Sequence, residues 1–240
     1  MSVGVWDLPT RLFHWLLFLA VVVSYVTGEE RGWLFAVHTV SGYIVALLLL
    51  FRLAWGFVGS RRSRFADFVP GRRAVADYAK RLARLDPPRF VGHNPLGGLM
   101  VVALMTVLGS AVLTGLFSAQ EEGTARGILF PLIAGYGDEG LGEIHEFLGN
   151  LVVVLASVHV AAVFADWLLT RENLVGAMLT GRKRVEPAVA AKEPPFVAGW
   201  RALIIVLLVA ISGAALFRGT DFAAIAVPPA QEKGDTTEED

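Results

Sequence analysis

The stretch EIHEFLGNLVVVLASVHV, residues 143–160, carries two histidines inside an apolar run. His145 and His159 are 14 residues apart. In an α-helix this spacing is about 21 Å of rise and roughly 1400° of rotation, or four turns less about 40°. Both imidazoles therefore lie on nearly the same face of one helix, at two depths. An ionisable side chain in an apolar span is costly and usually faces the bundle interior, so both are candidate functional residues.

The composition around this stretch is typical of a membrane protein. The chain of 240 residues is 55% hydrophobic and 18% charged, whereas an ordinary soluble domain has about a quarter of its residues charged. A formal net charge of -1 argues against a nucleic-acid-binding protein, which has an excess of basic over acidic residues and a basic surface patch. The absence of cysteine excludes thiolate zinc sites, iron–sulfur clusters, disulfides and covalently attached haem.

Five apolar stretches are long enough to cross about 30 Å of hydrocarbon, which takes roughly 20 helical residues. They cover residues 10–27, 33–57, 96–118, 141–169 and 197–217. The first helix is expected to begin with Asp7 as its N-cap and Pro9 in its first turn. The third is expected to begin in the same way, with Asn94 as the N-cap and Pro95 in the first turn. The start of the chain lacks the features of a secretory signal, so we expect the first stretch to stay as an anchor. The predicted fold is all-α, an integral membrane four-helix bundle with a fifth, C-terminal transmembrane helix.

The charges of the connecting loops predict the orientation of the chain. Residues 52–90 hold ten Lys or Arg against three Asp, and the loop after the fourth stretch is also basic. The positive-inside rule therefore places these loops and the N-terminus in the cytoplasm. Residues 71–85 form either a basic amphipathic helix on the inner membrane surface or a plain cytoplasmic loop. We divide the chain into a core at 1–185, a linker at 186–196, the fifth helix, and an acidic tail at 218–240, expected to be disordered and outside.

Two further histidines occupy matching depths. His14 lies just past the predicted cytoplasmic start of the first helix, and His38 just past the outer start of the second. Because the fourth helix runs inward, His145 is level with His38 and His159 with His14. Two facing His pairs, stacked across the bilayer in a helix bundle, suit two haem b groups, because imidazole binds haem iron axially. Neither level supplies the further ligands of a zinc or di-iron site, while a proton relay through the four histidines stays open.

Glycines and polar residues around these levels add weaker signals. Glycines in and beside the helices favour close approach of a flat macrocycle, although Gly is common in membrane helices for packing alone. His93, Asn94 and Arg11 suit haem propionates or a quinone head group, since cationic and amide donors bind carboxylate and carbonyl oxygens. A surface histidine next to an N-capping Asn94 is the alternative. Arg52 either pairs with a propionate or extends its guanidinium to the aqueous interface.

Four motifs resemble the bacterial cytochrome b561 group, which includes the b-type subunits of nickel–iron hydrogenases. They are VWDLPTRLFHW at 5–15, HTVSGY at 38–43, GHNPLGG at 92–98 and the stretch at 143–160. The resemblance covers about residues 1–185. It implies a four-helix membrane core that carries two haem b groups and passes electrons between membrane quinone and a partner protein. The haem ligands that it implies are His14, His38, His145 and His159.

The function expected from the residues and the resemblance is electron transfer in a bacterial inner membrane. The quinone pool and a periplasmic redox protein, a c-type cytochrome or a hydrogenase, are the expected partners, and the C-terminus is expected on the periplasmic side. With His on both sides of each iron no position is open to oxygen, so we expect a carrier, and quinol or quinone oxidoreductase activity stays open. A superoxide oxidase of the same fold is one alternative, although it needs a positive outer funnel and the outer loops are acidic. A haem-free transport subunit is the other.

Overall fold

Long apolar helices dominate the structure, a computed structural model that describes residues 1–118, 127–134 and 140–220. In the described part of the chain, five helices are long and apolar enough to span a membrane. They are α1 (Leu8–Thr27), α2 (Trp33–Val58), α5 (Pro95–Phe117), α6 (Leu141–Thr170) and α9 (Trp200–Gly219). These helices correspond one to one to the five predicted stretches, so the prediction of an all-α membrane protein is confirmed.

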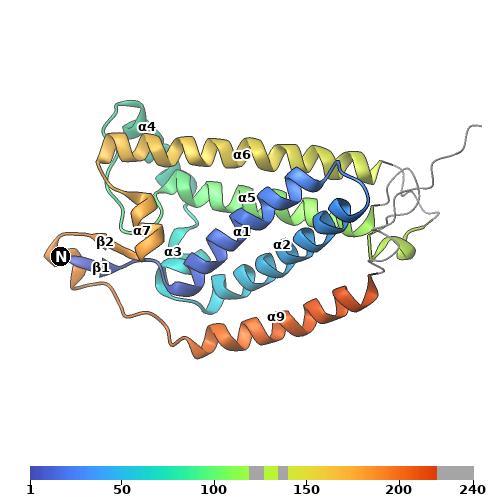
Figure 1. Ribbon diagram of the computed structural model, residues 1–240. Coiled ribbons are helices and arrows are strands. Elements are labelled where there is room, and N and C mark those ends of the chain that lie inside the picture. Colours follow the sequence, from blue (N-terminus) through green and yellow to red (C-terminus); the bar gives the residue numbers. More distant parts are fainter. Residues whose placement is uncertain (119–126, 135–139, 221–240) are drawn as a thin grey trace, which may run out of the picture.

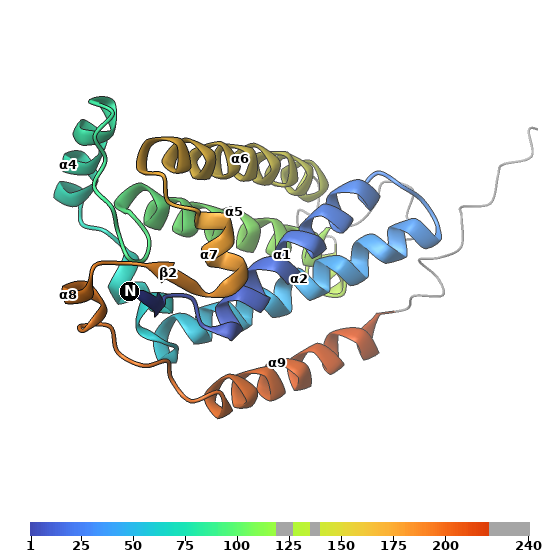
Figure 2. The same ribbon diagram turned by 60° about the vertical axis from the view of Figure 1, so that its left-hand side comes forward.

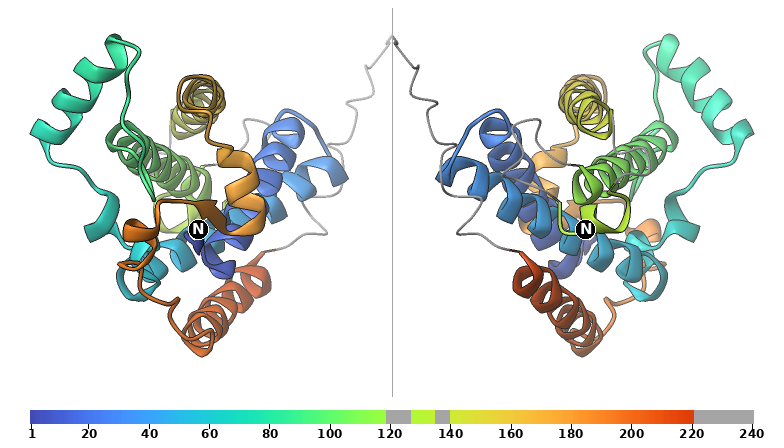
Figure 3. Two further views of the ribbon diagram at one scale, coloured as in Figure 1. Left: turned by 90° about the vertical axis from the view of Figure 1, so that its left-hand side faces the viewer. Right: turned by 90° about the vertical axis from the view of Figure 1, so that its right-hand side faces the viewer.

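The first four of these helices form the bundle, and α9 lies along one side of it (Figure 1). α5 packs on α6 and α1 packs on α2, while α2 also contacts α5 and joins the two pairs. The centre of the bundle is an apolar cluster to which all four helices contribute: Ala20, Val45, Leu49, Leu108 and Val152. A second cluster joins α9 to the bundle through Ala202 and Ile205, which pack with Phe13, Phe51 and Trp55. The end-on view shows α9 as a separate outer layer (Figure 3).

The helix starts follow the predicted capping signals. The Asp7 side chain accepts a hydrogen bond from the Thr10 N–H at 2.9 Å and begins α1. The Asn94 side chain accepts from the Gly97 N–H at 2.7 Å and begins α5. Each cap satisfies one of the main-chain donors that a helix leaves unpaired at its N-terminus. These caps fix where His14 and the residues just before α5 lie relative to the bundle.

Short elements gather at the end of the bundle where α1 begins and α2 ends (Figure 2). They are η1 (Arg61–Ser63), α3 (Phe65–Phe68), α4 (Arg72–Ala83), α7 (Leu174–Thr180) and α8 (Pro187–Ala190). The strands β1 (Ser2–Gly4) and β2 (Arg182–Arg184) pair antiparallel there, with Val3 opposite Lys183. At the opposite end the described residues include η2 (Phe130–Leu132). The sheet ties the N-terminus to the chain that follows α6.

The predicted linker at 186–196 is docked onto this end of the bundle. It contains α8, and its Glu193 forms an ion pair with Arg62 in which both side chains are largely buried. The Ser60 hydroxyl accepts a hydrogen bond from the Val197 N–H at 3.1 Å, directly before α9. The segment therefore holds α9 in place rather than serving as a free tether. Most of the acidic tail expected at 218–240, from residue 221 onward, lies outside the described residues.

The segment expected as either a basic amphipathic helix or a loop is helical as α4. Its Tyr78 is buried, whereas Arg72, Arg73, Lys80 and Arg81 are exposed. Seen end-on, α4 projects sideways from the bundle (Figure 3). The helix therefore contacts the bundle through an apolar edge and presents its basic residues outward.

Candidate functional site

Two pairs of histidines face each other inside the bundle, one pair at each level. His14 of α1 lies opposite His159 of α6, with 6.4 Å between the ring centroids. His38 of α2 lies opposite His145 of α6, with 5.9 Å between the centroids. These are the two pairs expected from the depths of the residues. We call the His14–His159 pair the inner level and the end of the bundle where α1 begins the inner end. We call the His38–His145 pair, near the starts of α2 and α6, the outer level.

Both imidazoles of the outer level are oriented by main-chain carbonyls. The His38 Nδ1–H donates to the carbonyl of Ser24 at 2.8 Å, and the His145 Nδ1–H donates to the carbonyl of Ala111 at 2.8 Å. A histidine that binds a metal typically donates its other ring N–H in this way, which fixes the tautomer and makes the ligand more basic. The Nε2 atoms of both rings are thus left as acceptors.

Glycines make room around the outer level. A Cβ on Gly115 would lie 2.7 Å from the His145 Cε1 atom, and one on Gly28 would lie 3.3 Å from the His38 Nδ1 atom. A Cβ on Gly42 or Gly149 would meet nothing within 4 Å. These two glycines follow the outer histidines by four residues, one helical turn toward the inner level. The first two glycines let the helices approach the imidazoles, and the other two border open space next to them.

The inner level is a cluster of polar atoms that lack partners. Among the described residues, the buried side-chain N or O atoms without a hydrogen bond are His14 Nδ1, His93 Nδ1 and Arg52 Nη1. The Arg52 side chain is 3% exposed, and its guanidinium lies over the rings of Phe65 and Phe68 at 5.2 and 5.4 Å. The alternative in which Arg52 extends to water is therefore wrong. Buried polar groups are normally hydrogen-bonded, so three unpaired atoms together indicate a site that a ligand completes.

His93 belongs to this cluster although it precedes α5. Its ring packs against Trp6 and Phe68, with centroid distances of 4.7 and 4.9 Å. Burial, with the nearby Arg52 guanidinium and the inner histidines, lowers the pKa of His93 to about 3. The ring is therefore neutral at physiological pH, with one nitrogen to donate and one to accept. The alternative of a surface histidine is not what the structure shows.

Arg11 and Asn94 are held by other parts of the chain. The Arg11 guanidinium donates to the carbonyls of Met178 and Leu179 at the end of α7. Asn94 caps α5 through its oxygen and donates from its Nδ2 atom to Asp166 Oδ1 at 3.2 Å. The structure thus brings His93 and Arg52 to the inner level, while Arg11 connects α1 to α7 and Asn94 connects α5 to α6.

Two carboxylates near the inner end, those of Asp7 and Asp166, also belong to the surroundings of the inner level, although they were not predicted as site residues. Asp7 is 3% exposed and accepts from Trp55 Nε1 at 3.1 Å and from Ser63 Oγ at 3.2 Å, besides capping α1. Asp166 lies seven residues after His159, on nearly the same helix face, and accepts from the Tyr78 hydroxyl at 3.5 Å. Burial and the Asp166 carboxylate raise the pKa of Tyr78 to about 12. The seven-residue spacing from His159 was the one available signal for Asp166.

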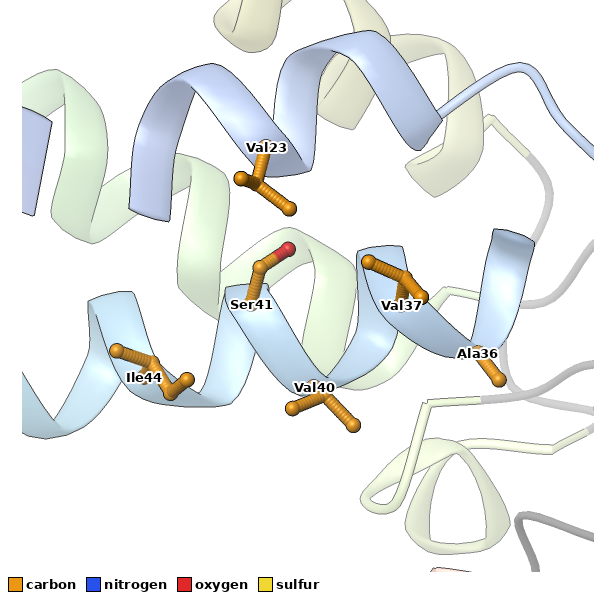
Figure 4. Close-up of a pocket in the computed structure, with 6 residues that line it drawn as sticks. All are labelled: Val23, Ala36, Val37, Val40, Ser41 and Ile44. Atoms are coloured by element: carbon orange, nitrogen blue, oxygen red, sulfur yellow. The ribbon is translucent and has the colours of Figure 1, made fainter. Parts of the chain in front are cut away.

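A separate apolar groove of about 510 Å³ lies between α1 and α2 (Figure 4). It is lined by Val23, Ala36, Val37, Val40, Ser41 and Ile44 and by no titratable side chain. Val23 is nine residues from His14, which places it about 180° around α1 from that histidine. The part of the groove that α1 supplies therefore lies on the opposite face of that helix from His14.

Five long apolar helices make this chain an integral membrane protein. A family model described as prokaryotic cytochrome b561 matches residues 5–181, and the chain belongs to this family. Family membership makes it a b-type cytochrome, which carries haem b and transfers electrons in the membrane.

The chain is similar to proteins of several bacteria that are named "Probable Ni/Fe-hydrogenase B-type cytochrome subunit". The Cupriavidus necator protein is 31% identical over 211 residues, which cover 74% of this chain and 85% of the relative. The Azotobacter vinelandii protein is 27% identical, with coverage of 75% and 88%. The Rhodobacter capsulatus protein is 23% identical, with coverage of 76% and 81%. No solved structure matches the chain significantly.

The described residues fit haem b at both levels. At each level the two facing imidazoles would be the residues that hold the haem iron. The centroid distances of 6.4 and 5.9 Å agree with this arrangement. Open space at Gly42 and Gly149 fits a flat macrocycle, and the unpaired Arg52 Nη1 atom fits a carboxylate.

Proposed function

We propose that the chain binds two haem b groups, the inner one through His14 and His159 and the outer one through His38 and His145. The observation that carries this proposal is that two imidazoles face each other at each level, with about 6 Å between their ring centroids. Haem iron supplies a one-electron carrier at each level. With two imidazoles as its ligands, neither haem iron would have a position open to oxygen. The chain then provides a two-step path for electrons across the membrane.

The residues around each level orient the ligands and exclude water. Main-chain carbonyls of Ser24 and Ala111 hold the outer imidazoles, and the apolar centre of the bundle separates the two levels. At the inner level we assign His93 and Arg52 to the haem propionates or to a quinone head group, because their unpaired atoms are the donors that such oxygens need. Asn94 and Arg11 support that level by fixing α5 and α7.

We further propose that electrons pass between the membrane quinone pool and a redox protein on the periplasmic side of a bacterial inner membrane. The relatives are named as subunits of nickel–iron hydrogenases, which supports a hydrogenase as the partner. A periplasmic c-type cytochrome is the second candidate. The basic residues of α4 and of β2 lie at the inner end, which supports a cytoplasmic N-terminus and a periplasmic C-terminus by the positive-inside rule.

The experiment is an optical redox assay of the purified, haem-loaded full chain in lipid vesicles. Reduced quinone, or hydrogen with a partner hydrogenase, is added, and reduction of the haem absorption bands is followed. Exchange with quinone in either direction, lost in the His14→Ala variant, is the result expected for a quinone-linked carrier. Haem bands that neither quinone nor the hydrogenase changes would contradict the proposed partners while leaving the two-haem assignment in place.

A further inference from the structure

Arg52 places a positive charge at the inner level. Its Nη1 atom is buried and has no hydrogen-bond partner among the described residues. The side chain is 3% exposed and lies among the rings of Phe13, Phe65 and Phe68. A guanidinium is always charged, and burying one of its N–H groups without a hydrogen-bond acceptor costs considerable free energy. A buried arginine of this kind is completed by an anion, and the planar fork of its donors matches a carboxylate.

The carboxylate of Asp7 lies near enough to interact electrostatically with Arg52, but it makes no hydrogen bond to the guanidinium. Asp7 is buried near the same end, and its oxygens accept from the Thr10 N–H, the Trp55 Nε1–H and the Ser63 hydroxyl. His93 does not neutralise the guanidinium, because a neutral imidazole brings no negative charge. The described residues therefore leave the Arg52 Nη1 atom without a hydrogen-bond acceptor, which a bound carboxylate would supply.

The outer level has the opposite electrostatic character. Its two imidazoles donate Nδ1–H to main-chain carbonyls, which makes them more electron-rich ligands. Glu143 and Glu146 flank His145 on α6. Electron-rich ligands and nearby negative charge stabilise ferric iron, whereas a nearby cation stabilises the more negative ferrous site.

We propose that Arg52 pairs with a propionate carboxylate of the inner haem and holds the inner site at a higher reduction potential than the outer site. This inference rests on the proposed binding of two haems. It gives the electron path a downhill direction from the outer level to the inner level. With haem bound at both levels, a single electron passed from the outer to the inner level would need no bond change and no proton transfer, and the Arg52 charge would favour the electron at the inner level.

The test is an equilibrium redox titration of the haem absorption bands in the haem-loaded full chain. The wild-type protein is expected to titrate in two components. Arg52→Gln is expected to lower the potential of the higher component and leave the lower component unchanged. Arg201→Gln is the matched control. Arg201 lies in the first turn of α9, where it is exposed and contacts the ring of Trp200. A higher component that does not move in Arg52→Gln, or a shift of the lower component alone, would overturn the proposal.

Single-haem variants test the same ordering without altering Arg52. His38→Ala leaves only the inner site intact, and His159→Ala leaves only the outer site intact. The haem that remains in His38→Ala is therefore expected at a higher reduction potential than the haem that remains in His159→Ala. Equal or reversed potentials overturn the inference even if Arg52→Gln fails to load haem. Haem content, measured on each sample, separates the two proposals. A wild-type chain with one haem or none contradicts the proposed function, whereas two haems with unchanged potentials contradict only the role of Arg52.

Discussion

His38 and His145 face each other with 5.9 Å between their ring centroids, and each donates its Nδ1–H to a carbonyl of a helix other than its own. His38 is held by Ser24 of α1, and His145 is held by Ala111 of α5. The outer level thus depends on all four helices of the bundle. A ligand bound between the two imidazoles would therefore join α1, α2, α5 and α6 at one point.

Removing one histidine of a pair is expected to remove one haem. His38→Ala or His145→Ala should retain about half of the bound haem, because each leaves the inner pair intact. The double variant His38→Ala/His145→Ala should also retain half, whereas His14→Ala/His38→Ala should retain none. Haem per chain, measured by the pyridine haemochrome method, checks this. Equal haem loss in the outer double variant and the mixed double variant would contradict the pairing.

Gly115 is expected to be essential for the position of the His145 imidazole. In Gly115→Ala the new Cβ would lie 2.7 Å from the His145 Cε1 atom, so the ring has to move. Changes in the groups that orient a metal ligand typically weaken binding by about 10- to 100-fold. We expect a loss of this size in haem retention at the outer level during dilution in detergent. Gly199→Ala is the control, since a Cβ there meets nothing within 4 Å. Equal retention in both variants would argue against the close approach.

Asp7 is expected to be a major source of stability at the inner end. Its carboxylate accepts from a main-chain N–H, an indole and a hydroxyl while 3% exposed. Hydrogen bonds to a charged group contribute about 1.5–3 kcal/mol each, so Asp7→Ala should destabilise the chain by about 3 kcal/mol or more. Asp77→Ala, which removes an exposed i,i+4 partner of Arg73, should change stability by about 0.5 kcal/mol or less. Thermal unfolding in detergent measures both, and similar midpoints would contradict the assignment.

Tyr78 is expected to make stability depend on pH in alkaline solution. Its pKa is raised from 10.0 to about 12, first by burial and then by the Asp166 carboxylate. Between these values the unfolded chain loses the phenolic proton and the folded chain keeps it, so stability is complete below pH 10 and falls as the pH rises toward 12.

Tyr78→Phe should remove this alkaline loss of stability. Tyr25→Phe is the matched control, because the Tyr25 hydroxyl is exposed and donates to Asn150 instead. The measurement is the unfolding midpoint as a function of pH for the three proteins. An identical alkaline decline in wild type and Tyr78→Phe would show that another group causes it.

The fifth helix is expected to be dispensable for the histidine pairs. α9 contacts the bundle mainly through α2, and neither pair draws a residue from it. A chain ending at residue 196 keeps the Arg62–Glu193 ion pair and should retain both haems, with a lower unfolding temperature because Ala202 and Ile205 leave the apolar cluster. Loss of haem from this variant would mean that the core does not end near residue 185.

The helices and the histidine pairs were predictable because their signals are periodic and local. Helical length, the 14-residue spacing of His145 and His159, and the matching depth of His14 and His38 suffice to place the two levels. The capping of α1 and α5 followed from the Asp and Asn residues before Pro9 and Pro95.

The surroundings of the inner level were not predictable because they depend on distant contacts. Arg11 binds carbonyls of α7 that are 167 and 168 residues away, and Tyr78 reaches Asp166 across 88 residues. Burial of Arg52 depends on Phe65 and Phe68, which follow a turn that no periodic pattern marks. For the same reason the docking of Glu193 onto Arg62 was missed, and the segment was expected to be a plain linker.

The most direct test is the haem content of the purified, detergent-solubilised chain. The pyridine haemochrome method, together with a reduced-minus-oxidised spectrum, gives the type and number of haems per chain. Two haem b groups per chain are expected, both six-coordinate and low-spin, since each level offers two imidazoles. One haem per chain would contradict the assignment at one level, and no haem would contradict it at both.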